Sequence, residues 1–177
     1  SISKNGEVLV VGKETSNRIY NSVNPLTIGV LNDGDNRYTK GEMAEIIHFN
    51  HKLNKAQKTI VHNYLSSKYN LPLEVNDFYT QDDSVNGDFD HHVAGIAIIN
   101  GESHLDSQGS GVLRVNNPSN SGIGDDKYFF WGQDVMGSSY DFNTEILAGD
   151  ENGNSYTINH LNTIWRVSKS EGTHDFG

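Results

Sequence analysis

The chain has 177 residues, enough for one large or two small domains, and a formal net charge of −10 from 13 basic and 23 acidic side chains. It contains no cysteine, which excludes disulfides and thiolate metal sites. No basic cluster occurs, so nucleic acid is not an expected partner, and the longest apolar run, at 93–99, is too short for membrane insertion.

Short apolar stretches separated by turn residues predict β-strands in the first part of the chain. They are EVLVV at 7–11, LTIGVL at 26–31 and EMAEIIHF at 42–49. An extended 42–49 segment would be apolar on both faces, so we expect it inside a β-sandwich. The sequence also starts at Ser1 in the middle of a pattern and without a leader, which predicts that it is an internal piece of a longer protein.

One amphipathic helix is predicted over 54–69. Asn54 followed by Gln57 is a capping-box pattern, Asn70 can adopt a left-handed terminating conformation, and Pro72 prevents continuation. Apolar residues at helical spacing predict the face that packs against the rest of the protein. These residues are Ile60, Val61, Tyr64 and Leu65.

Strand patterns return after the helix and predict a second β-sandwich over 73–177, truncated at its C-terminus. The predicted strands are 92–99, 111–115, 127–132, 144–149, 155–159 and 162–168. We expect the domain boundary near residue 72. The consecutive aromatic residues at 128–131 would alternate between faces, which predicts core packing for at least one set and leaves a sugar-binding platform open for the other.

Residues 27–73 resemble the C-terminal end of a laminin-G-like, concanavalin A-type jelly roll of bacterial surface proteins. The resemblance rests on Ile28-Gly29, Tyr38, Gly41-Glu42, Ala44 to Ile47, Leu53-Asn54, Tyr64-Leu65 and Lys68-Tyr69. It implies an all-β fold in which residues 1–72 end an incomplete jelly roll and the helix closes it. Because such a jelly roll needs roughly a dozen strands, we expect a missing N-terminal segment of the same protein or a neighbouring subunit to supply the others.

The following part is similar to a β-sandwich of unassigned function that follows such jelly rolls in secreted proteins of marine and gliding bacteria. The similar stretches are 93–118, 125–134 and 161–172. Together the two resemblances imply a secreted or cell-surface location for a multidomain protein.

Oxygen-bearing side chains at alternate positions are candidate calcium ligands. These residues are Asp33, Asp35, Asp150, Asn152 and Asn154. Asp150 does not begin an EF-hand, because Ser155 and Leu161 occupy the positions that require Gly and Glu. In an extended segment, Asp88, Asp90 and His92 would share a face and could bind a transition metal.

Catalytic patterns are weak, and we predict no catalytic residues. Glu42 and Glu45 would point to opposite faces of a strand, whereas glycoside hydrolysis needs two carboxylates flanking one bond. Neither a nucleophile elbow nor an H-E-x-x-H motif occurs. By analogy of fold, the two resemblances imply a non-catalytic binding or adhesion module for a glycan or surface polymer, with calcium as a candidate ion. The alternatives are a spacer or assembly module of a stalk, fibre or filament, and a glycosidase fragment.

Overall fold

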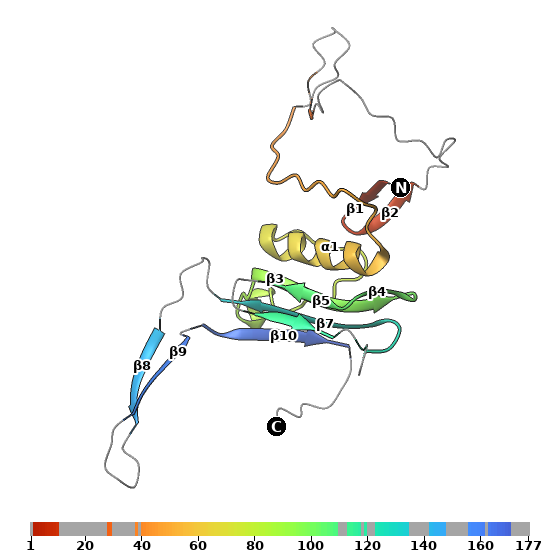
Figure 1. Ribbon diagram of the computed structural model, residues 1–177. Helices are drawn as coiled ribbons and strands as arrows, with labels where there is room; N and C mark the ends of the chain where they lie inside the picture. Colours follow the sequence, from red (N-terminus) through yellow and green to blue (C-terminus); the bar gives the residue numbers. More distant parts are fainter. Residues whose placement is uncertain are drawn as a thin grey trace. The chain divides into compact units, whose positions relative to one another are not determined.

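The computed structural model describes residues 2–10, 28–29, 38, 40–109, 113–117, 119, 123–134, 142–147, 156–161 and 163–170. This part of the chain consists mostly of strands in antiparallel sheets, with one α-helix and one short 3-10 helix (Figure 1). The elements are β1 Ile2–Lys4, β2 Glu7–Val10, α1 Lys55–Tyr69, η1 Ser84–Asn86, β3 His91–Ile99, β4 Glu102–His104, β5 Asp106–Gln108, β6 Arg114–Asn116, β7 Lys127–Gln133, β8 Phe142–Leu147, β9 Tyr156–Leu161 and β10 Trp165–Lys169. The predicted all-β class is confirmed at this level.

The ends of α1 are those that the sequence predicts. The side chain of Asn54 accepts a 2.8 Å hydrogen bond from the backbone N–H of Gln57, and the Gln57 side chain accepts a 3.0 Å bond from the N–H of Asn54. At the other end, Asn70 is left-handed, with φ 49° and ψ 51°. The capping box and the asparagine terminator are therefore both confirmed.

The buried face of α1 differs from the predicted apolar stripe. Its buried residues are Ala56, Thr59, Ile60, Asn63, Ser66 and Ser67. Of the predicted stripe only Ile60 is buried, and the other three side chains are half-buried. Small side chains let a helix approach a sheet closely, and polar ones can be buried when their hydrogen bonds are satisfied, so helical spacing of large apolar residues indicated the wrong face.

A four-stranded antiparallel sheet in the order β10-β7-β3-β4 forms the centre of the fold, and α1 lies across one of its faces (Figure 1). The core on this face contains Ala56 and Ile60 of α1 packed with Ala97 and Phe130 of the sheet. Gly95 makes this packing possible, because a Cβ there would lie 2.7 Å from the Phe130 ring. Phe130 and Trp131 are fully buried, which confirms core packing for part of the aromatic run.

Three antiparallel pairs complete the described strands, and the first of them joins β1 to β2. β5 pairs with β6, and an ion pair with a 2.7 Å hydrogen bond from Arg114 Nε to Asp106 Oδ1 joins these strands. β8 pairs with β9 over six residues each. Of the described strands, the sequence fails to predict β1, β4 and β5, which contain only three residues each.

The chain divides into two compact units, residues 1–10 with 53–177 and residues 11–52. The helix thus belongs to the same unit as the strands that follow it, and the domain boundary near residue 72 stays a prediction. Residues 42–49, predicted as a buried strand, form no strand, and Met43 and Ile46 are 57% and 55% exposed. That prediction was wrong because apolar alternation can form a strand only where a neighbouring strand pairs with it.

Candidate functional site

Backbone strain marks the start of β3. Asp88 and His92 have positive φ angles of 62° and 53°, so two left-handed residues enclose the tripeptide 89–91. Such conformations are uncommon for residues other than glycine and gather at binding and active sites. They also overturn the expectation that Asp88, Asp90 and His92 share one face of an extended segment.

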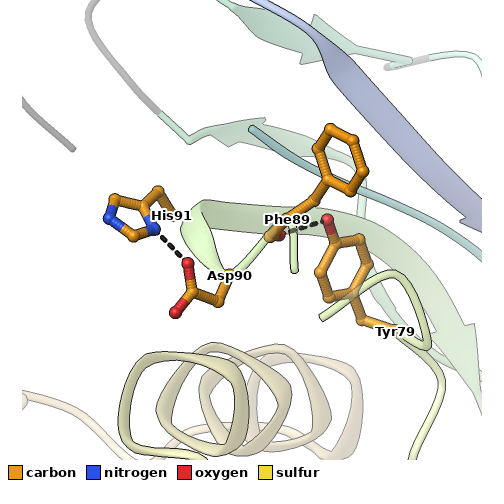
Figure 2. Close-up of polar contacts among 4 residues, drawn as sticks. All are labelled: Tyr79, Phe89, Asp90 and His91. Carbon is orange, nitrogen blue, oxygen red and sulfur yellow. Dashed lines mark hydrogen bonds and ion pairs between the residues drawn. The ribbon is translucent and has the colours of Figure 1, made fainter. Parts of the chain in front are cut away.

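Asp90 and His91 form an ion pair between Oδ1 and Nδ1, with side chains 27% and 24% exposed (Figure 2). Because an ionised carboxylate can only accept, Nδ1 carries the proton of this contact. The other ring nitrogen, Nε2, accepts a hydrogen bond when the imidazole is neutral and donates one when it is protonated, so it can bind a ligand in either state. Figure 2 shows the second ring nitrogen pointing away from Asp90 and from α1.

A chain of buried hydrogen bonds holds this tripeptide against α1. Asn63 Oδ1 accepts from the backbone N–H groups of Phe78 and Tyr79 at 2.8 and 2.9 Å. The Tyr79 hydroxyl in turn donates a 2.6 Å bond to the carbonyl of Phe89 (Figure 2). Burial is the main cause of the raised pKa of Tyr79, and the charges of Asp82 and Asp90 add to it. Tyr79 therefore remains a neutral hydrogen-bond donor.

A cavity of about 350 Å³ lies beside this pair, and we call it the His–Tyr pocket. Its lining residues are Tyr64, Lys68, Asp90, His91, His92 and Gly109. Lys68 Nζ donates a 2.8 Å hydrogen bond to the Tyr64 hydroxyl and lies 5.2 Å from the centre of that ring. The pocket thus combines an aromatic ring with several polar groups that are already held in place.

A second cavity, of about 530 Å³, shares Asp90 with the His–Tyr pocket and is strongly acidic. Its aspartates are Asp77, Asp82, Asp83, Asp88 and Asp90. Burial raises the pKa of Asp77. Burial is also the main cause of the raised pKa of Asp82, and the charge of Asp77 adds to it. A hydrogen bond with Ser67 acts in the opposite direction and lowers the pKa of Asp82. In the described part of the chain, no three His, Asp or Glu side chains are arranged to hold a metal ion.

The five predicted calcium ligands, Asp33, Asp35, Asp150, Asn152 and Asn154, lie outside the described residues, so the calcium sites stay predictions. The sequence did not reveal the Asp90–His91 pair, because adjacent residues on a regular strand point to opposite faces. It also assigned Tyr64 to the packing face of the helix. The Asp-His-His run at 90–92 was the one available signal for this site.

Comparisons with family models, curated proteins and solved structures gave no match to this chain. Within the described residues, no helix has the length and apolar character needed to cross a membrane.

Proposed function

We propose that this chain is a non-catalytic binding module of a secreted or surface-attached bacterial protein, and that it holds a glycan in the His–Tyr pocket. The resemblances at 27–73 and 93–172 support the setting: the end of a laminin-G-like jelly roll followed by a β-sandwich. The aromatic ring and the polar groups that line the pocket support a glycan as the ligand.

One observation carries the ligand proposal: Tyr64 and the Asp90–His91 pair line the same cavity. Sugars present apolar C–H faces and rings of hydroxyl groups. An aromatic side chain can pack against the former, while fixed donors and acceptors bind the latter. The cavity of about 350 Å³ falls within the range of small-molecule sites, roughly 300–1,000 Å³.

A binding role suits this pocket better than glycoside hydrolysis. Hydrolysis uses two carboxyl groups on either side of the bond, separated by about 5 to 9.5 Å. Asp90 is the one carboxylate among the described lining residues, and it is engaged by His91. The contact with Asp90 holds the His91 imidazole in one orientation, and such contacts occur in binding sites as well as in catalytic sites.

A glycan array tests the proposal, read with and without added Ca²⁺ because calcium is a candidate structural ion. Hits are then titrated by calorimetry against Tyr64→Ala and Tyr69→Ala. Both rings lie near the Lys68 ammonium, 5.2 and 5.3 Å from their centres, but only Tyr64 lines the pocket. We expect Tyr64→Ala to weaken binding at least about tenfold and Tyr69→Ala to leave it unchanged. Equal losses, or no hit on the array, would contradict glycan binding in this pocket.

The exposed apolar segment 42–49 favours a second function, assembly by strand addition. Its exposed side chains include Met43, Ile46, Ile47 and Phe49. An exposed apolar segment can complete the sheet of another polypeptide, either an N-terminal segment of the same protein or a neighbouring subunit. Light scattering of the wild type and of Ile46→Lys tests this: we expect concentration-dependent association only in the wild type. A monomeric wild type at all concentrations would exclude self-assembly through this segment.

A further inference from the structure

The four-stranded sheet has two edges, and β4 forms the one that is covered. The carbonyl of Ser103 in β4 accepts a 2.9 Å hydrogen bond from the side-chain amide of Asn54. The neighbouring Glu102 carboxylate accepts a bond from the backbone N–H of Lys55. The N-terminal end of α1 therefore occupies this edge. Covering an edge in this way is one means by which proteins prevent further strand pairing.

β10 forms the other edge, and no strand of the described part of the chain pairs with its outer side (Figure 1). Just beyond β10, the backbone N–H of Ser170 donates a 3.2 Å hydrogen bond to the carbonyl of Tyr128. Because the direction of hydrogen bonding alternates along an antiparallel strand, the even-numbered residues of β10 face β7. Trp165 and Val167 consequently direct their backbone N–H and C=O groups outward.

β10 lacks the usual features that block an edge. It contains no proline, and its register with β7 is regular throughout. Arg166 is exposed, but its guanidinium lies 5.2 Å from the centre of the Phe89 ring. A Cβ at Gly132 of β7 would lie 2.6 Å from the Phe89 carbonyl, so this arginine extends inward over the sheet. The edge thus presents unshielded backbone beside two half-buried apolar side chains, Trp165 and Val167.

The exposed segment 42–49 has side chains that match this edge. Met43, Ile47 and Phe49 would share one face if the segment were extended. An antiparallel register with Ile47 opposite Val167 also places Phe49 opposite Trp165. Aromatic pairs and pairs of β-branched residues are favourable across antiparallel strands. In the same register the outward backbone groups of Trp165 and Val167 form four hydrogen bonds with the added strand.

We propose, on the basis of the assembly function above, that segment 42–49 of a second copy adds to β10 in this register as a fifth strand of the sheet. The contact joins two different surfaces of the chain, so it is heterologous. A heterologous contact repeats from copy to copy and produces a ring or an open filament. The partner of the β10 edge is therefore another copy of the same chain.

Sedimentation velocity over a concentration series tests the acceptor edge and the added segment separately. We expect weak association of the wild type, because one added strand buries less than the roughly 1,200 Å² of a standard interface. Val167→Pro should lose this association and remain folded by circular dichroism, since the N–H that it removes faces outward. Ile47→Lys should also lose association, because it places a charge against Val167.

Mixing these two variants is the decisive experiment. Val167→Pro retains segment 42–49, and Ile47→Lys retains the β10 edge, so the mixture should form a one-to-one dimer and no larger species. Ser103→Pro is the matched control on the covered edge. The Ser103 carbonyl faces away from β3, and the N–H of the same residue faces the same way. This variant should associate like the wild type.

Disulfide cross-linking tests the register, and the absence of native cysteine makes the result specific. With oxidised glutathione as the oxidant, Ile47→Cys mixed with Val167→Cys should give a cross-linked dimer. Ile46→Cys mixed with Val167→Cys should not, because residue 46 would lie on the other face of the added strand.

The possible failures can be told apart. Undiminished association of Val167→Pro would overturn addition at β10 and leave assembly through segment 42–49 intact. Undiminished association of Ile47→Lys, or a monomeric wild type, would contradict both. Cross-linking of Val167→Cys with itself would show that two β10 strands pair with each other instead. None of these outcomes affects glycan binding in the His–Tyr pocket.

Discussion

The hydroxyl of Tyr79 donates a 2.6 Å hydrogen bond to the carbonyl of Phe89, the residue just before the Asp90–His91 pair. This bond links the segment under α1 to the strained start of β3. It gives a fully buried tyrosine a role at the wall of the His–Tyr pocket without contact with a ligand.

Tyr79→Phe should therefore reduce both stability and glycan affinity. A buried carbonyl left without its donor costs about 1–3 kcal/mol of unfolding free energy. Release of the Phe89 backbone should also loosen the Asp90–His91 pair and weaken glycan binding several-fold. Chemical denaturation and calorimetry measure the two effects.

Asn63→Ala should be among the most destabilising substitutions in the described part of the chain. The Asn63 side chain accepts from Phe78 and Tyr79 and donates to the carbonyls of Thr59 and Asn76 at 2.9 and 2.8 Å.

Alanine would leave the backbone N–H groups of Phe78 and Tyr79 without their acceptor, so we expect a loss of about 3 kcal/mol in urea unfolding. Asn50→Ala, at an exposed residue, should stay within about 0.5 kcal/mol of the wild type. A small effect of Asn63→Ala would mean that water replaces the side chain.

Gly95→Ala should disrupt the core where Gly124→Ala does not. A Cβ at residue 95 would lie 2.7 Å from the Phe130 ring, whereas at residue 124 the nearest atom is the Lys127 Cγ at 3.7 Å. Overpacking of this kind costs about 1–3 kcal/mol. Thermal unfolding of both variants measures the difference, and Phe130→Leu should recover part of the loss when combined with Gly95→Ala. Equal stability of the two glycine variants would contradict the close packing.

The acidic cavity should make stability depend on pH through Asp82. Burial raises the pKa of Asp82 above its ordinary value of 3.8, so the folded protein holds this proton more tightly than the unfolded chain. Its contribution to unfolding free energy consequently rises as the pH falls through the folded pKa, and it levels off below about 3.8, where both states are protonated.

Asp82→Asn should remove this contribution and raise stability near pH 7 by up to about 1 kcal/mol, after allowance for solvent screening. The readout is the difference between wild-type and variant urea midpoints from pH 3 to pH 8, which should shrink at the acidic end. Asp88→Asn, at an exposed left-handed position that asparagine tolerates, is the matched control. A difference that is constant with pH would show that Asp82 does not titrate in this way.

Local chemistry made parts of this fold predictable from the sequence. The capping box at Asn54, the terminator Asn70 and the strands β3, β7 and β10 each depend on residues within a few positions of one another. The all-β class followed from many such segments, each with turn residues at its ends.

Long-range packing decided the features that the sequence did not predict. The buried face of α1 is determined by how the helix packs on β3 and by the four hydrogen bonds of the Asn63 side chain. The helical spacing of apolar residues carries no information about either of these. The Asp90–His91 pair depends on left-handed residues at 88 and 92, which alternation along a strand does not anticipate. The 42–49 segment has a strand pattern but pairs with no strand of the described part of the chain, which a local pattern cannot reveal.

The position of α1 between two parts of the chain limits where recombination can divide such proteins during evolution. The sequence resemblance predicts that the helix ends a jelly roll, whereas its packing places it over the sheet of the following strands. A recombination event between residues 69 and 73 would thus separate the sheet from its cover and expose Ala97 and Phe130 to water. The helix and the strands that follow it are therefore expected to be inherited together, with exchange points before residue 53.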